Sequence, residues 1–204
     1  MKENRENNRG ALVLPRAGFT LIEILVVIAI VAILASILMP VAGKARKSAM
    51  KKRAMVEMNS IKVAALQFLA DHRYMPWPAT IVEDRPIWIG NDMWTETEKD
   101  QQEVMELLTG NNPLKKIYLQ IPEKSRPADK TMLFLDPWTD AGGKRQYYRI
   151  GLDRNLDGGI LLGPPFGGGD YVKERVLVYS RGDPEDSSGI PDLRTFDLPL
   201  ATGP

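Results

Sequence analysis

The chain contains no cysteine, and His72 is its only histidine. Without cysteine it has no disulfide, no thiolate nucleophile, no Cys-ligated zinc and no iron–sulfur cluster. The absence of cysteine does not show whether the protein lies in an oxidising or a reducing compartment. A multi-histidine metal site is impossible, and a Ser–His–Asp triad would have to use His72. The chain also lacks an excess of charge of either sign, since it has 27 Lys and Arg and 26 Asp and Glu. Its net charge therefore does not attract nucleic acid. These absences speak against most enzymes and against nucleic-acid binding.

The 204-residue chain does contain a long apolar run, from Phe19 to Met39, whose only charged residue is Glu23. About 20 helical residues span a bilayer core of about 30 Å. A core helix of a soluble domain would show a polar stripe, which this run lacks. A secretory signal would have a shorter apolar region that ends at a small-residue cleavage site, whereas this run continues into Pro40. The run therefore predicts a transmembrane helix at 19–40.

Basic residues flank the apolar run on both sides, so charge alone does not orient it well. Counted naively, the larger group after the run would place the C-terminal side in the cytoplasm. We expect this group to form a solvated collar at the membrane surface that contacts lipid phosphates. Its members are Lys44, Arg46, Lys47, Lys51, Lys52 and Arg53.

The junction before the apolar run reads Arg16-Ala17-Gly18-Phe19-Thr20-Leu21-Ile22-Glu23. It resembles the class III signal of type IV pilins and pseudopilins, in which a short basic leader ends in glycine. The resemblance implies that residues 1–18 are a leader, that a prepilin peptidase cuts after Gly18 on the cytoplasmic face, and that Phe19 is then methylated. It also places the N-terminus in the cytoplasm and the C-terminal domain in the periplasm. In many members of this family a proline stands where Pro40 stands here.

Glu23 is unusual because a carboxylate inside an apolar membrane segment costs a few kcal/mol, and such residues have a partner by default. After cleavage the α-amino group of Phe19 is available, in the same subunit or a neighbouring one, and pairing would set the register of an assembly. Alternatively, Glu23 snorkels to the headgroups. Pro40 should kink or locally melt the helix, and Gly43 makes melting easier.

Residues 41–74 are expected to continue as an amphipathic helix that packs one face on a globular domain. It should end by Tyr74, because the following Met-Pro-Trp-Pro cannot continue it. His72 is expected to be a satisfied, partly buried histidine. The apolar face would carry Met55, Met58, Ile61, Ala65, Phe68 and His72, and the other side Glu57, Asn59, Lys62, Gln67 and Asp71.

Residues 75–204 are predicted to form a periplasmic α+β domain, with a small antiparallel sheet packed on the long helix as in pilins. One helix should be capped within 95–98 and stop at Gly110, and 112–119 could form a second. Strands are predicted at 131–135, 146–152 and 175–180. The pieces 108–113, 136–138 and 178–182 look like parts of major pseudopilins of type II secretion systems, although Thr139-Asp140 departs from the usual glycine–asparagine.

Two loops could hold calcium. Asp153, Asn155 and Asp157 follow the calcium-loop pattern D-x-N-x-D-G, but Pro164 replaces its position-12 glutamate, and Asp170 could substitute only if the chain folds back. The second loop, 182–192, resembles the calcium loop of major pseudopilins. That resemblance implies Asp183 and Asp192 as ligands, with Asp186 as a further one. Alternatively, each loop is an Asp/Gly turn satisfied by its own backbone.

The resemblance implies a structural subunit, not an enzyme, that leaves the inner membrane for a helical filament through a secretion assembly platform. The favoured hypothesis is a type II secretion pseudopilin with calcium as its cofactor. A type IV pilin for adhesion, motility or DNA uptake is the alternative, although many pilins close their C-terminal loop with a disulfide, which this chain cannot form. A membrane-anchored, calcium-dependent binding module is a third possibility, but it would have no reason to bury Glu23.

Overall fold

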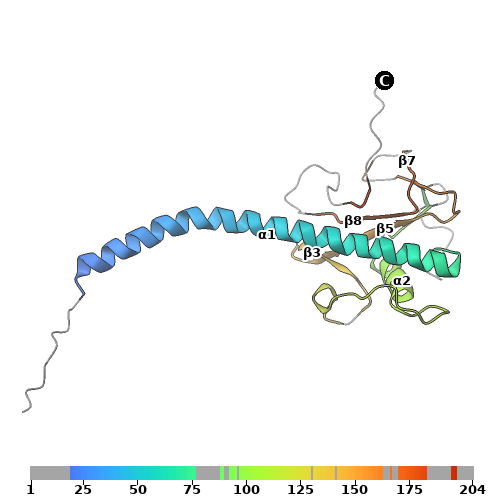
Figure 1. Ribbon diagram of the computed structural model, residues 1–204, viewed down its shortest axis with the longest axis horizontal. Helices are drawn as coiled ribbons and strands as arrows, with labels where there is room; N and C mark the ends of the chain where they lie inside the picture. The colour runs from blue at the N-terminus through green and yellow to red at the C-terminus, as the bar shows by residue number, and fades with distance from the viewer. Residues whose placement is uncertain are drawn as a thin grey trace, which may run out of the picture. The chain divides into compact units, whose positions relative to one another are not determined.

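The apolar run and the amphipathic segment behind it are both helical, within α1 (Leu21–His72) (Figure 1). The computed structural model describes residues 19–76, 88–89, 92–95, 97–129, 131–140, 142–162, 166, 170–182 and 194–196. Contacts divide the chain into two units, residues 1–45 and 46–204, which are treated separately below. α1 ends where the proline-rich segment begins, as predicted.

The second unit is an α+β domain with antiparallel pairing throughout its described strands. The main sheet has the order β1-β2-β5-β8, and two smaller sheets pair β3 with β4 and β6 with β7. The helices after α1 are α2 (Glu98–Leu108) and the short 3₁₀ helix η1 (Glu123–Ser125). The strands are β1 (Trp88–Ile89), β2 (Asp92–Trp94), β3 (Leu135–Thr139), β4 (Arg145–Tyr147), β5 (Arg149–Leu152), β6 (Ile160–Leu161), β7 (Tyr171–Val172) and β8 (Val176–Tyr179).

Both faces of the main sheet are covered, and β8 shows this most directly. Its four residues are all buried, although a strand with one wet face would alternate. Val176 and Val178 join the core that also contains α1 and α2. Leu177 and Tyr179 point the other way, into a second cluster that contains Trp94 and the β6–β7 pair. The prediction of a small antiparallel sheet on the long helix is confirmed.

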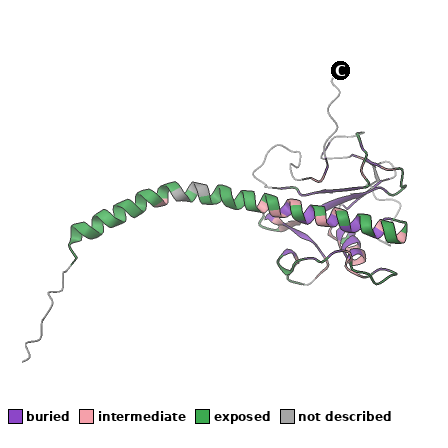
Figure 2. Cartoon of the chain, viewed as in Figure 1, coloured by how far each residue is buried: buried purple, intermediate pink, exposed green. Residues whose placement is uncertain are grey.

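The buried face of α1 follows the predicted three- and four-residue spacing (Figure 2). It buries Ala54, Met58, Ile61, Ala65 and Phe68 completely, while Met55 lies half-buried beside them. His72 stacks on Phe68 with ring centroids 4.1 Å apart and is partly buried, as expected. Its Nε2 nevertheless has no hydrogen-bond partner, so the expectation of a fully satisfied histidine is wrong.

Local capping explains where α2 begins and ends. Thr97 is its N-cap, and Thr97 and Asp100 bond reciprocally in a capping box. Gly110 follows the helix with a φ of +118°, a conformation that favours glycine. The second helix predicted at 112–119 is absent from this described stretch. There the Asn112 side-chain amide donates to the carbonyl oxygens of Leu107 and Lys116, which fixes a non-helical turn.

Two of the three predicted strands differ from the structure. The strand expected at 131–135 begins only at Leu135. The observed strand, β3, continues to Thr139 and contains Asp136. The segment expected at 146–152 is divided at Tyr148 into β4 and β5, which pair in different sheets. The third prediction is confirmed by β8.

A buried glutamine stabilises the break at Tyr148. Gln101 on α2 is fully buried, and its Nε2 donates to the carbonyl oxygens of Phe134 and Tyr148 at 2.9 and 3.3 Å. Its Oε1 accepts from the Phe134 N–H at 3.1 Å. The side chain of α2 thereby replaces strand partners that these backbone groups would otherwise need.

The expectation that Glu57 faces solvent is wrong, since it is only 7% exposed. Its carboxylate accepts from the Tyr148 hydroxyl at 2.6 Å and from the Ser125 hydroxyl at 2.9 Å, and it pairs with Arg53 at 2.9 Å. Arg53 also donates to Ser125 at 2.6 Å. Burial and the bond to Glu57 raise the pKa of Tyr148, so its hydroxyl stays a proton donor. This group, which we call the Glu57 network, joins α1 to η1 and to the segment between β4 and β5.

A second buried carboxylate lies in β3. Asp136 is fully buried, its Oδ2 accepts from the Ser180 hydroxyl at 2.6 Å, and its Oδ1 accepts from the Trp138 N–H at 2.9 Å. Burial raises the pKa of Asp136 to about 6, against the hydrogen bonds and the charge of Arg145, which lower it. Asp136 therefore changes charge near neutral pH.

Tyr148→Phe should lower the free energy of unfolding by about 1–3 kcal/mol, because it leaves the buried Glu57 carboxylate short of a donor. Tyr118→Phe is the matched control, because the Tyr118 hydroxyl donates to an exposed partner, Asp71. Its loss should stay near 0.5 kcal/mol. Tryptophan fluorescence during urea unfolding measures both, and equal losses would contradict the role of the Glu57 network.

Asp136→Asn should change how stability depends on pH. A carboxyl whose pKa rises from 3.8 to about 6 on folding binds extra protons in the native state between about pH 4 and 6. The wild-type free energy of unfolding therefore contains a contribution that falls as pH rises through this window, by about 2–3 kcal/mol in total. Unfolding series at pH 4 to 7 should show the variant gaining relative to wild type by that amount. A constant difference would mean that Asp136 titrates normally.

Candidate functional site

The part of the first unit that the structure describes is an apolar helix with exposed side chains. Between Phe19 and Leu34 the large apolar side chains are between 49% and 83% exposed, and Figure 2 shows this part of α1 exposed on every turn. By length and composition, α1 is the one helix among the described residues that could cross a membrane. So much exposed apolar surface needs lipid or other helices around it.

Glu23 takes part in a capping box at the start of α1. Its Oε2 accepts from the Thr20 N–H and from the Thr20 hydroxyl, both at 2.7 Å, and the Glu23 N–H donates back to Thr20 Oγ1 at 3.3 Å. The spacing Thr-x-x-Glu is the sequence signature of this motif, so the sequence could have revealed it. Glu23 therefore has a local partner besides the α-amino group that cleavage would create at Phe19.

The other residues predicted at this end of the chain lie as follows. Gly18 falls outside the described residues, and Phe19 precedes α1 with its side chain exposed. α1 continues through Pro40 and Gly43, so local melting does not occur, and a kink at Pro40 stays a prediction. Five members of the basic group at 44–53 are exposed as expected, whereas Arg53 is partly buried in the Glu57 network.

The structure describes only one of the two predicted calcium loops. Asp183, Asp186 and Asp192 lie outside the described residues, so that loop stays a prediction. In the 153–160 loop, Asp157 Oδ2 accepts from the Asn155 side-chain amide at 2.7 Å, and Asp157 Oδ1 accepts from the Gly159 N–H and the Tyr171 hydroxyl at 3.2 and 2.6 Å. These bonds lower the pKa of Asp157. At Asn155 and Asp157 the loop thus resembles the self-satisfied turn.

Asp153 differs from the rest of its loop, and β2 supplies a neighbour that sequence reasoning missed. Asp153 Oδ2 accepts from the Gly158 N–H at 3.0 Å, while its Oδ1 is buried without a partner. Asp92 accepts from the Leu161 N–H at 2.7 Å through Oδ2, and its Oδ1 is likewise buried and unpartnered. Burial, and then the charges of Asp153 and Asp157, raise the pKa of Asp92. The chain does fold back near Asp170, whose carbonyl oxygen accepts from the Leu162 N–H at 2.7 Å, and the Asp170 side chain is exposed, so its role as a substitute ligand stays a prediction.

Asp92 could not be found from local spacing, because about 60 residues separate it from Asp153 and only strand pairing joins them. Among the described residues, no three His, Cys, Asp or Glu side chains gather closely enough in this conformation to hold a metal ion. The two buried aspartates are therefore a pair, with Asp157 turned toward Tyr171.

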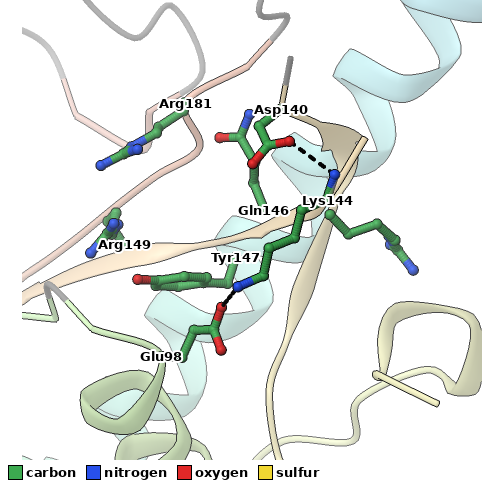
Figure 3. A pocket seen from close by; sticks show the side chains of 8 residues that line it. Glu98, Asp140, Lys144, Gln146, Tyr147, Arg149 and Arg181 are labelled. Atoms are coloured by element: carbon green, nitrogen blue, oxygen red, sulfur yellow. Dashed lines mark hydrogen bonds and ion pairs between the residues drawn. The ribbon is translucent and has the colours of Figure 1, made fainter. Parts of the chain in front are cut away.

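A separate pocket of about 260 Å³ lies beside the β3–β4 turn (Figure 3). Three of its charged groups are already engaged: Lys144 pairs with Glu98, and Arg149 lies over the Tyr147 ring at 4.5 Å and donates to the Thr95 carbonyl oxygen. The residues that line it include no serine, histidine or cysteine, so they form no Ser–His or Cys–His pair. They are Glu98, Asp140, Lys144, Arg145, Gln146, Tyr147, Arg149 and Arg181.

Comparison with known proteins gives one match. Residues 15–39 match the family model described as the prokaryotic N-terminal methylation motif. Searches of curated proteins and of solved structures found no match. The matched residues contain the glycine–phenylalanine junction, the capping box and most of the exposed apolar helix. The motif implies processing by a prepilin peptidase and points to a structural, membrane-anchored subunit. The chain carries the prepilin-type signal of type IV pilins and pseudopilins, and this signal supports a pilin-like filament subunit.

Proposed function

We propose that the protein is a pseudopilin of a type II secretion system that acts in protein export across the outer membrane. The observation that carries its role as a filament subunit is the methylation motif at 15–39, at the start of an apolar helix that the rest of the chain leaves exposed. A plain membrane anchor needs the apolar helix but has no use for a peptidase signal.

In the proposed mechanism the peptidase removes residues 1–18 on the cytoplasmic side, and Phe19 gains a free amine. The apolar helix holds the subunit in the inner membrane, with residues after 44 in the periplasm. An assembly platform then moves subunits into a filament, where apolar helices pack on one another. Since a methylated amine remains cationic, Glu23 of one subunit can pair with Phe19 of a neighbour and set the register.

Two features favour a secretion pseudopilin over a type IV pilin. Two of the pieces that look like those of major pseudopilins, 136–138 and 178–182, meet in the structure through the Asp136–Ser180 hydrogen bond. The chain also has no cysteine to close a C-terminal loop. Both features support the finer assignment only through resemblance, so it needs a cellular test.

Gly18→Asp should leave the leader attached, because the peptidase needs a small residue at the cut. Intact-mass spectrometry of the membrane fraction would show the variant with residues 1–18 and the wild type without them and with one added methyl group. Gly10→Asp is a matched control inside the leader and should be processed normally. Wild-type protein that retains its leader would contradict the whole proposal.

Glu23→Gln should permit insertion and cleavage but impair filament assembly. Glutamine keeps the acceptor that caps the helix, so this variant removes the charge alone, whereas Glu23→Ala removes charge and cap together. Both variants would be expressed in a strain of the source organism that lacks the gene, and sheared filaments counted by electron microscopy. If Glu23→Gln assembles as wild type while Glu23→Ala does not, capping explains Glu23 and the pairing argument fails.

The same strains distinguish the two filament systems. For a secretion pseudopilin, the gene deletion and Glu23→Gln should leave exported proteins in the periplasm instead of the culture medium. Unchanged secretion together with lost surface motility or DNA uptake would identify a type IV pilin instead. Thr139→Ser, an exposed conservative change away from the helix, serves as the matched complementation control.

A further inference from the structure

Two buried aspartates lie where the pairing of β2 with β5 ends. The printed register ends with Met93 opposite Leu152, and its extension by one residue places Asp92 opposite Asp153, which directly follows β5. Asp92 is 4% exposed and Asp153 0%. Directly opposite residues have Cβ atoms only about 4.5–5.5 Å apart, and like charges at such positions are destabilising.

Each of these carboxylates uses one oxygen and leaves the other without a donor. The used oxygens hold the ends of the 153–160 loop: Asp153 Oδ2 accepts from Gly158, and Asp92 Oδ2 accepts from Leu161. The second oxygens, Oδ1 of both residues, are buried and have no hydrogen-bond partner. A buried charge without a partner is costly, and a cation bound between the two Oδ1 atoms would offset that cost.

The basic side chain that pairs with Asp153 does not supply that cation. Arg175 approaches Asp153 on the oxygen that already accepts from Gly158, with Nε 3.9 Å from Oδ2, and its side chain is 46% exposed. This contact is longer than a hydrogen bond and leaves both Oδ1 atoms unpaired.

The loop has the residue pattern with which calcium loops begin. Asp153, Asn155 and Asp157 occupy positions 1, 3 and 5, and position 6 is Gly158, with a φ of +99°. Glycine at position 6 permits the sharp turn that directs the preceding oxygens inward. The Gly158 N–H fixes one oxygen of Asp153 and leaves the other directed away from that bond. Only the acidic ligand of position 12 is absent from the local sequence, where Pro164 stands.

We infer that Asp92 replaces the missing position-12 ligand, so that Asp92 and Asp153 together anchor a calcium ion at the 153–160 loop. Asn155, Asp157 and the main-chain carbonyl of position 7 are the further oxygen ligands that the loop pattern provides. Asp157 would release Asn155 and turn from Tyr171, which explains why three carboxylates do not already converge. A flexible oxygen set of this kind suits calcium better than magnesium, which demands near-ideal octahedral geometry.

The test uses the full-length protein in detergent, first treated with chelator and then given calcium chloride. All four tryptophans lie in the second unit, so their fluorescence reports the melting of that unit. Calcium at about 100 times its Kd should raise the wild-type melting temperature by about 5–10 °C. Isothermal titration calorimetry measures binding without relying on stability.

Asp92→Asn keeps an oxygen for the Leu161 N–H but removes one of the opposed charges. In calcium this variant should lose most of the rise in melting temperature, with binding weakened at least tenfold. In chelator it should melt above wild type, because the repulsion with Asp153 is gone. Asp129→Asn is the matched control: it removes one aspartate charge from an exposed turn and should keep the full calcium response.

Several results would overturn the inference. One is a wild-type melt that is the same in chelator and in calcium, with no binding heat. Another is a calcium response that survives in Asp92→Asn but disappears in Asp183→Asn, which would place the ion in the 182–192 loop. The inference also fails if Asp92→Asn melts below wild type in chelator and still binds calcium normally, because Asp92 then acts only through its bond to Leu161.

Discussion

The carboxylate of Glu57 is the group on which the second unit depends. It lies on the otherwise apolar face of α1, and the Ser125 and Tyr148 hydroxyls and the Arg53 guanidinium all reach it. Apolar contacts tolerate some rearrangement with repacking, whereas a buried carboxylate is stable only where its donors are. The Glu57 network therefore fixes the register of α1 on the domain, and Gln101 does the same for α2.

Periodicity and local spacing predicted much of the fold. The buried face of α1, the capped start of α2 and the position of β8 all followed from residues close in sequence. The errors come from contacts distant in sequence. Glu57 looked like a solvent-facing residue because its donors lie about 70 and 90 residues away. The 146–152 segment looked like one strand because its break needs Gln101.

The candidate sites also differ in whether their residues lie close together in sequence. The signal around Gly18, Phe19 and Glu23 is a continuous motif, so the sequence alone identified it and the family match confirms the motif, while the roles of these residues stay predictions. The spacing of Asp153, Asn155 and Asp157 could also be recognised in the sequence. Asp92 could not be recognised, because its proximity to Asp153 depends on the pairing of β2 with β5. Sequence reasoning also suggested Asp170, which lies near the loop in sequence but is exposed in the structure.

The bare apolar surface of the first unit limits how a subunit can travel. A dozen large apolar side chains between Phe19 and Leu34 are about half exposed or more. At about 1.5–3 kcal/mol for each such side chain moved between water and an apolar environment, passage through water would cost tens of kcal/mol. A route with that barrier is too slow for any cell. In the proposed filament the helix therefore moves directly from lipid onto other helices within the plane of the bilayer, which keeps the growing end at membrane depth.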